Sequence, residues 1–308
     1  MQNKAKGYLL GAFAAATYGM NPLFALPLYG AGLNPESVLL LRYLFAIPLV
    51  AAMIKLRGRD FAVPRRSIPA LSLMGVLMAV SSLTLFMSYN FMDAGIASTI
   101  LFVYPVMVAV IMSLLYGERT GLRTWLCIAV ATAGIGLLFK GSDGATLSIA
   151  GTLLVLVSAL SYAVYIVGVN RSSLRDMPTL KVTLWVVVAG AVLFALRTIP
   201  DGGPVLPDSL FLWFCAAGLA IFPTAVSFLC TTSAIHRIGS TPVAILGALE
   251  PVTALLIGVG VFGERLTLRD GIGIAMIITA VTLVIGGSAF TSHMLRFRKL
   301  FPSLRRKR

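Results

Sequence analysis

Long apolar blocks separated by short polar connections dominate the chain. Ten blocks of roughly helix-spanning length can be counted, at approximately residues 8–29, 36–54, 69–89, 94–116, 122–139, 149–169, 179–198, 210–232, 240–262 and 270–289. A helix of about 20 residues rises about 1.5 Å per residue and so crosses a hydrocarbon core of ~30 Å. The pattern therefore predicts an all-α polytopic membrane protein with ten transmembrane helices. Continuous apolar runs, rather than short alternating segments, argue against a transmembrane barrel.

Composition supports the same class. Of the 308 residues, 58% are hydrophobic and only 12% are charged, whereas soluble chains carry roughly 25% charged residues. The connections are too short to hold a second, soluble domain, so we expect one membrane-embedded unit. The three cysteines share no metal-like spacing and lie within apolar blocks, which favours buried thiols over a metal site: Cys127, Cys215 and Cys230.

The basic residues predict the orientation of the chain. If the N-terminus lies inside the cell, twenty of the 25 Lys and Arg residues fall on inside segments. Four fall outside, and Arg42 lies within a block. Cytoplasmic segments carry the excess of Lys and Arg, so both termini are predicted to be cytoplasmic.

The net charge of +14 is explained by this bias and does not require a nucleic-acid partner. The tail, residues 291–308, carries seven of the basic residues. We expect it either to rest on anionic lipid headgroups, at about 1 kcal/mol per basic residue, or to serve only as a retained charge cluster.

Two parts of the chain repeat. "YPVMVAVIMSLLYGER" from Tyr104 matches "EPVTALLIGVGVFGER" from Glu250 in its Pro-Val and Gly-Glu-Arg elements. "GYLLGAFAAATY" from Gly7 resembles "GTLLVLVSALSY" from Gly151, in the same order and at a similar offset. The chain is therefore predicted to consist of two halves.

Each half holds five predicted helices, an odd number, so the second half must enter the membrane from the opposite side. Inverted repeats of this kind are typical of secondary transporters, whose substrate site lies near the bilayer midplane between the halves. We expect a first five-helix repeat over residues 1–140, an inverted repeat over 141–290 and a basic tail over 291–308.

The duplicated "PV…GER" ends, the five helices per half and the chain length resemble the EamA-type drug/metabolite transporter superfamily over essentially the whole chain. The resemblance implies a multi-pass protein of the bacterial cytoplasmic membrane that exports amino acids or other small metabolites. Tyr104 stands where the second half has Glu250, so the two halves differ chemically at this matched position.

Prolines within the blocks indicate irregular helices. Pro22 and Pro27 lack an N–H and so free the carbonyls of Tyr18 and Leu23. Lipid cannot satisfy such groups, so each kink should lie against protein or a water-filled cavity. The block is either a kinked packing helix or a cavity wall that bends. The matched kink positions in the two halves are Pro105 and Pro251.

Polar side chains inside the blocks are candidates for a substrate cavity. Singly, each could instead bond a helix carbonyl, and the tyrosines could be interfacial anchors. Together they suggest aromatic walls and few charges, suited to a zwitterion with an apolar side chain. The candidates are Tyr18, Asn21, Asn90, Tyr104, Tyr162, Tyr165, Ser227, Thr231 and Glu250. The lining blocks should be 8–29, 69–89, 94–116, 149–169, 210–232 and 240–262, with 122–139 and 270–289 at the periphery.

Two ionisable residues lie inside blocks. Glu250 is about ten residues into block 240–262, where a charged side chain costs at least ~2.5 kcal/mol. In a structural role, Glu250 would donate a hydrogen bond to the freed carbonyl of Gly247. In a functional role, it would change its partner or its protonation during transport, or it would contact a substrate amine. Arg42 either extends towards the surface or pairs structurally, or else it contacts a substrate carboxylate.

Other functions find less support. Gly258, Gly260 and Gly263 match G-x-G-x-x-G, but without the preceding strand that a dinucleotide site needs. No Walker A lysine motif is present, so we expect no cofactor and no ATP-driven motor. An intramembrane enzyme would need a nucleophile–base pair, a carboxylate pair or a metal cluster. Glu250 is the only acid deep within a block, so no carboxylate pair exists and we do not expect an enzyme. A channel or facilitator for small solutes remains the alternative.

The predicted topology can be tested at the end of the chain. A reporter that is active only in the cytoplasm should be active when fused after Arg308, because twenty basic residues against four place this end inside. Activity of an outside-specific reporter alone at this position would contradict both the topology and the inverted repeat.

Overall fold

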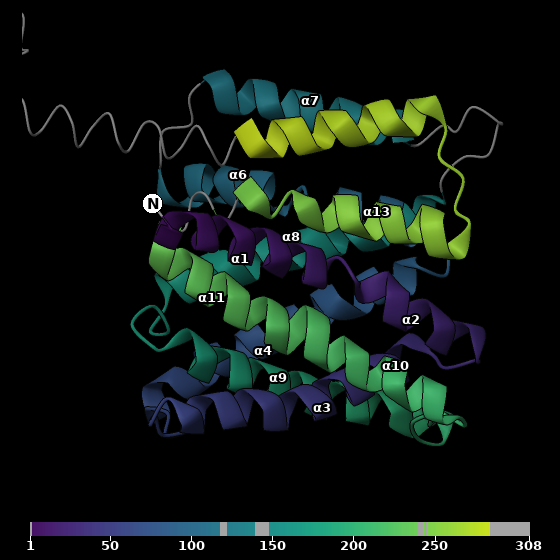
Figure 1. Ribbon diagram of the computed structural model, residues 1–308. Coiled ribbons are helices and arrows are strands. Elements are labelled where there is room, and N and C mark those ends of the chain that lie inside the picture. Colours follow the sequence, from purple (N-terminus) through teal and green to yellow (C-terminus); the bar gives the residue numbers. More distant parts are fainter. Residues whose placement is uncertain (1, 118–121, 139–147, 239–242, 244, 284–308) are drawn as a thin grey trace, which may run out of the picture.

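A computed structural model describes residues 2–117, 122–138, 148–238, 243 and 245–283. Throughout this described part, all regular secondary structure is helical (Figure 1). The basic tail predicted for residues 291–308 lies outside it. The elements are α1 Gln2–Tyr18, α2 Asn21–Gly30, α3 Pro35–Leu56, η1 Arg65–Ser67, α4 Ile68–Ser88, α5 Ala94–Leu101, α6 Tyr104–Tyr116, α7 Leu122–Leu138, α8 Ile149–Arg171, α9 Thr179–Thr198, η2 Ile199–Asp201, α10 Leu210–Ala220, η3 Ile221–Val226, α11 Ser227–Ile238, α13 Leu249–Phe262 and a helix over 268–283.

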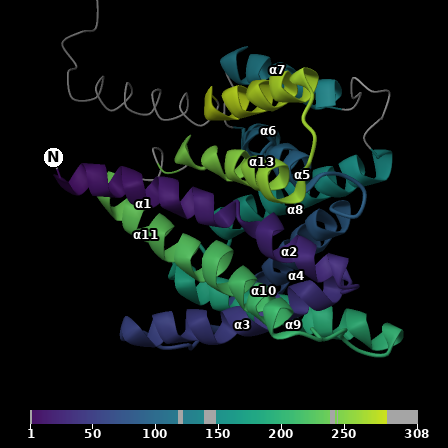
Figure 2. The same cartoon turned by 45° about the vertical axis from the view of Figure 1, so that its right-hand side comes forward.

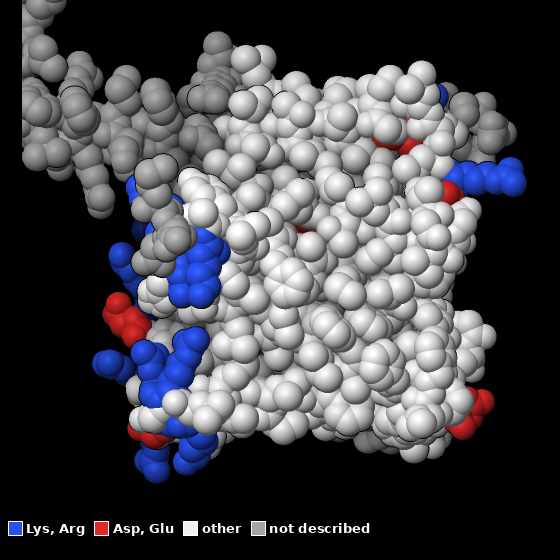
Figure 3. Space-filling model, viewed as in Figure 1, with Lys and Arg blue, Asp and Glu red and all other residues white. Residues whose placement is uncertain are grey.

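Seven helical stretches among the described residues are long and apolar enough to cross a membrane. Two shorter apolar helices, Trp125–Leu137 and Leu249–Phe262, accompany them. These helices support a multi-pass membrane protein, while the number ten stays a prediction. Lys and Arg side chains gather at one end of the bundle (Figure 3). We call this the basic end, and it includes Lys55, Arg57, Arg171, Arg175 and Arg237.

Three of the predicted continuous spans are interrupted, and the ninth is interrupted by a turn at Gly247 and Ala248, just before α13. The first breaks between α1 and α2 at Gly19 and Met20, and the fourth breaks between α5 and α6 at Phe102 and Val103. Each of these two breaks lies just before a proline, Pro22 or Pro105, which cannot donate to the carbonyl four residues earlier. The eighth span stays helical but passes through a π-helical turn, η3, that contains Pro223.

The predicted repeat is visible in the geometry of α6 and α13. Both helices begin at the residues just before a proline, and both end at a glycine in the left-handed conformation, Gly117 (φ 65°) and Gly263 (φ 70°). A residue other than glycine is disfavoured there because its Cβ would crowd the backbone. By contrast, α8 runs unbroken through Tyr162, whereas α1 ends at Tyr18. The prolines that follow Tyr18 have no counterpart after Tyr162.

Small residues let α1 lie close to the second half of the chain. A Cβ added at Gly7 would overlap Ile238 of α11, one at Gly11 would overlap the Leu246 side chain, and one at Gly19 would overlap the carbonyl of Glu250. The small residues of α1 therefore form a face for close helix packing. Figures 1 and 2 both show α1 lying along α11.

The helices α5 and α13 cross at the end of the bundle opposite the basic end. Glu264, just after α13, accepts a hydrogen bond from the backbone N–H of Ala94 at 3.1 Å. Asp93 occupies the N-cap position of α5, but its side chain makes no cap bond. The cap therefore comes from the other half of the protein. Burial and the nearby charge of Asp93 raise the pKa of Glu264 above its usual value.

The crossing of α5 and α13 makes a stability prediction. A Cβ at Gly95 would lie 2.9 Å from the Cα of Leu255, and backbone cannot move aside cheaply. Gly95→Val should lower thermal stability in detergent by about 1–3 kcal/mol through overpacking.

Gly136 in α7 is the matched control, because nothing lies within 4 Å of an added Cβ. Gly136→Val should leave the melting temperature nearly unchanged. Equal melting temperatures for the two variants would refute the close crossing.

Candidate functional site

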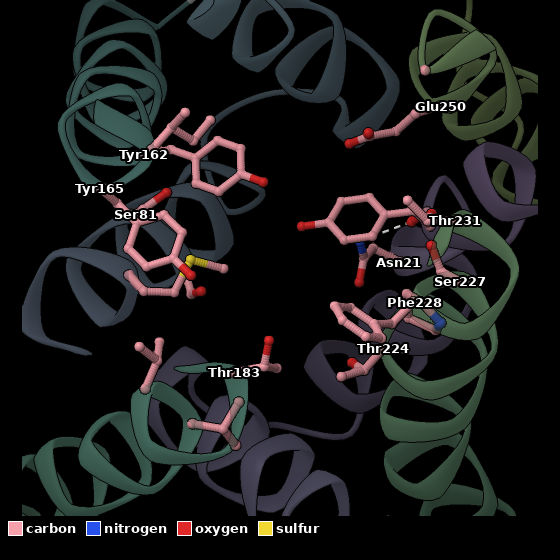
Figure 4. Close-up of a pocket in the computed structure, with 18 of the residues that line it drawn as sticks. Asn21, Ser81, Tyr162, Tyr165, Thr183, Thr224, Ser227, Phe228, Thr231 and Glu250 are labelled. Carbon is pink, nitrogen blue, oxygen red and sulfur yellow. Dashed lines mark hydrogen bonds between the residues drawn. The ribbon is translucent and has the colours of Figure 1, made fainter. Parts of the chain in front are cut away.

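A cavity of about 510 Å³ lies in the middle of the bundle. Its walls come from both halves: α1 to α4, the α5–α6 break, α8, α9, and the η3–α11 and Gly247–Glu250 segments. Figure 4 shows Tyr162 and Tyr165 on one side, facing Asn21 and Thr231 across the opening. Blocks 36–54 and 179–198, which the prediction assigned neither to the lining nor to the periphery, also contribute, because Arg42, Tyr43, Thr183 and Val187 of α3 and α9 line the cavity.

The peripheral position expected for the fifth and tenth blocks agrees with the structure. The α7 helix packs against the helix over 268–283, where a Cβ at Gly134 would lie 2.8 Å from Ile277. No residue of either helix is part of the cavity lining. Figure 1 shows the pair side by side, away from α3 and α9.

Eight of the nine candidate substrate residues line this one cavity. The exception is Asn90, which is exposed in the turn after α4 because that helix ends at Ser88. Contact with substrate stays a prediction for all nine. The eight are Tyr18, Asn21, Tyr104, Tyr162, Tyr165, Ser227, Thr231 and Glu250.

Tyrosines form one wall of the cavity. The rings of Tyr104 and Tyr162 meet edge to face with centroids 4.7 Å apart, and Tyr162 stacks on Tyr165 at 5.9 Å. Such ring pairs are worth about 0.5–1.5 kcal/mol beyond the area they bury. The wall is therefore rigid and apolar, with hydroxyl groups at its edge.

The proline at the α1–α2 break orients a polar side chain. Pro22 leaves the carbonyl of Tyr18 without a helical donor. The side-chain amide of Asn21 donates to this carbonyl at 2.9 Å, which satisfies it. The other atom of the amide, Asn21 Oδ1, is buried and has no hydrogen-bond partner. A buried acceptor left in this state costs about 1–3 kcal/mol.

The proline in η3 does the same for a second side chain. Pro223 leaves the carbonyl of Leu219 free, and the hydroxyl of Thr224 donates to it at 3.2 Å. The Thr224 oxygen in turn accepts from Nε of Arg42 at 3.4 Å. The guanidinium also lies 5.7 Å from the centroid of the Phe86 ring. These contacts hold Arg42 at the cavity, with only 8% of its surface exposed.

The third proline frees a backbone carbonyl beside Glu250. We expected the Glu250 side chain to be able to bond the carbonyl of Gly247. Instead the backbone N–H of Glu250 donates to that carbonyl at 3.0 Å. Within the described part of the chain, the Glu250 carboxyl group has no hydrogen-bond or ion-pair partner. Figure 4 shows it projecting into the cavity on the side opposite Tyr162.

Several other polar groups at the cavity are occupied by packing. Ser227 donates to the carbonyl of Ala14 at 2.9 Å and so ties α11 to α1. The hydroxyls of Tyr43 and Ser82 lie 2.8 Å apart, and those of Ser81 and Ser158 lie 3.1 Å apart. These bonds join different helices around the cavity, and of the predicted substrate candidates only Ser227 takes part in them.

Sequence reasoning missed part of the lining. It left Arg42 between a structural role and a substrate contact. It overlooked five polar residues of the lining, Tyr43, Ser81, Ser82, Thr183 and Thr224. The Pro-Thr pair in an apolar block was a usable signal for Thr224, since it parallels the Asn-Pro pair at Asn21. Single serines and threonines in apolar blocks carry no such signal.

The cavity reaches the basic end of the bundle. Its lining includes Val169 and Asn170 near the end of α8 and Thr179 at the start of α9, all close to the basic end. Towards the opposite end, apolar side chains close the interior, and Phe24 stacks on Phe222 at 5.5 Å. Among the residues that the structure describes, no group of His, Cys, Asp and Glu could hold a metal ion.

The two halves of the chain each match the EamA-like transporter family, over residues 5–140 and 149–286. The chain belongs to the EamA-like transporter family. These matched ranges confirm two repeats of the kind that the duplicated motifs indicated. A membrane transporter is the function class that this membership supports.

Similar proteins carry the same general description. An uncharacterized transporter of Archaeoglobus fulgidus is 28% identical over 252 residues, covering 80% of this chain and 85% of the relative. The uncharacterized transporter YdfC of Bacillus subtilis is 26% identical, covering 84% and 82%. The uncharacterized inner membrane transporter YedA of Escherichia coli K12 is 25% identical, covering 79% of each.

One solved crystal structure has the same fold. It superposes with a TM-score of 0.66 at 19% identity and covers 91% of this chain and 96% of the other. The likeness supports the arrangement of the helices and carries no information on substrate.

Proposed function

We propose that the protein is a secondary transporter that exports amino acids or related small metabolites by alternating access. It resides in a bacterial inner membrane with both termini in the cytoplasm, so the basic end faces the cytoplasm. The observation that carries this proposal is a central cavity, shared by the two repeats, that reaches the basic end and is closed by packed side chains at the other.

The closed end of the cavity supports alternating access rather than an open pore. Closure rests on contacts between the halves, including α5 against α13 and the Glu264 cap on Ala94. A cap of this kind is worth about 1 kcal/mol. It is weak enough to break and reform as the halves rock, and the helix breaks beside Pro22 and Pro105 are natural hinges.

The cavity lining supports a small organic substrate. A volume of about 510 Å³ lies within the range of small-molecule sites. The wall combines tyrosine rings with one cation, Arg42, and one acid, Glu250. Such a lining suits a zwitterion with an apolar side chain better than a hydrated ion or a large polar solute.

A channel or facilitator is the alternative, and counterflow separates it from a carrier. Proteoliposomes loaded with an unlabelled amino acid should transiently accumulate the labelled one above equilibrium. A channel equilibrates the label without overshoot. Saturable exchange with overshoot for any of the common amino acids supports the carrier, and flux without saturation or overshoot contradicts it.

Substitution of Glu250 tests whether a single side chain of the cavity takes part in transport. The carboxyl group of Glu250 projects into the cavity without a partner in the described chain, and it is the one acid among the residues that line the cavity. Glu250→Gln keeps the shape but cannot ionise. We expect counterflow to fall about tenfold or more and to lose its dependence on pH.

Glu36→Gln is the matched control, because Glu36 lies outside the cavity near Arg197. It should keep both the rate and the pH profile. Normal flux and an unchanged pH profile in Glu250→Gln would leave Glu250 with a packing role only.

A further inference from the structure

The cavity holds two polar groups that the protein itself leaves incomplete. Asn21 Oδ1 is a hydrogen-bond acceptor without a donor, and only 5% of the surface of Asn21 is exposed. Arg42 is a cation without an anion, because no carboxylate of the described residues forms an ion pair with it. Both residues line the same cavity.

A hydrogen bond within the protein fixes the orientation of each of these two side chains. The amide of Asn21 is fixed by its donation to the carbonyl of Tyr18, so Oδ1 faces away from that carbonyl. Arg42 is fixed through Nε, whose partner Thr224 has committed its own proton to Leu219. The Thr224 oxygen can therefore only accept from Arg42. The other N–H groups of the guanidinium lie near the Tyr18 hydroxyl, and no carboxylate of the described residues engages them.

The two groups are of opposite kind, and Glu250 adds a second acceptor to the same lining. The hydroxyl of Tyr18, the residue whose carbonyl Asn21 satisfies, lies near both Arg42 and Glu250. We call Arg42 the donor pole of the cavity lining and Asn21 with Glu250 its acceptor pole, and the tyrosine rings belong to the same lining. Burying a cation without an anion is costly, so a ligand that supplies the anion gains affinity at this place.

We propose that Arg42 binds the carboxylate and Asn21 Oδ1 the ammonium group of an amino-acid substrate. This assignment rests on the proposed function. Arg42 offers the planar pair of N–H groups that matches a carboxylate. Asn21 accepts one ammonium proton and Glu250 receives another. The side chain of the substrate lies against Tyr104, Tyr162 and Tyr165.

The test separates the two poles by removing one group of the substrate at a time. Leucine and phenylalanine are each compared with the decarboxylated amine and with the deaminated acid, as competitors of counterflow in proteoliposomes. The wild-type protein should prefer the amino acid to its amine by about ten- to a hundredfold, as expected for loss of one charge-assisted bond.

Arg42→Gln should abolish the preference for amino acid over amine while leaving competition by the amine unchanged. Arg42→Lys keeps a charge and should retain part of the preference. Arg197→Gln is the matched control, because Arg197 is exposed at the end of α9 and does not line the cavity. It should keep the wild-type preference.

Asn21→Leu should reduce the preference for amino acid over deaminated acid about tenfold, and Asn21→Asp, which keeps an acceptor oxygen, should retain it. If Asn21→Leu does not fold, retention of the preference by Asn21→Asp together with its loss in Asn21→Ser decides this pole.

The outcomes that overturn each claim differ. An unchanged preference for amino acid over amine in Arg42→Gln overturns the carboxylate assignment alone. An unchanged preference over the deaminated acid when the Asn21 acceptor is removed or displaced overturns the ammonium assignment alone. Absence of counterflow for every common amino acid in the wild-type protein overturns the proposed function and this assignment with it.

Discussion

Hydrocarbon offers no hydrogen bonds, and this constraint organises the interior of the protein. Each proline in a membrane helix frees one carbonyl, which costs several kcal/mol if it stays unsatisfied in lipid. The chain places three such prolines at the cavity and satisfies the freed carbonyls locally, through the Asn21 amide, the Thr224 hydroxyl and the Glu250 backbone N–H. The helix breaks, the polar cavity and the orientation of its side chains therefore share one cause.

The same constraint explains why two similar halves do different chemistry. The second and first repeats keep the break before the matched prolines and the left-handed glycines at Gly117 and Gly263. Only the first half breaks its opening helix, because α8 lacks the prolines that follow Tyr18. Only the second half carries an acid at the matched position, Glu250 against Tyr104. Two related halves thus enclose a cavity whose lining differs between them, which suits the ligand with two different ends that we propose.

Much of this arrangement could be predicted from the sequence, because a proline kink, an apolar block and a duplicated motif are local signals. These indicated the repeats, the kink after Tyr18 and the cavity position of Glu250. Orientation at the cavity was harder to predict. Arg42 is held by Thr224, 182 residues away, and Asn90 fell outside because α4 ends at Ser88. The block pattern could not separate the lining of α3 and α9 from packing, since both faces of these helices are apolar.

Alternation of the two ends of the cavity is the central claim, and distances between spin labels test it most directly. One pair, at Thr179 and His236, reports on the basic end, and a second pair, at Phe91 and Leu268, reports on the opposite end. In nanodiscs, addition of a transported amino acid should shift the populations of both pairs, with the first distance shortening as the second lengthens. If each pair instead shows one distance that does not change on addition of substrate, while substrate still crosses the membrane, alternating access is contradicted and a fixed pore is favoured.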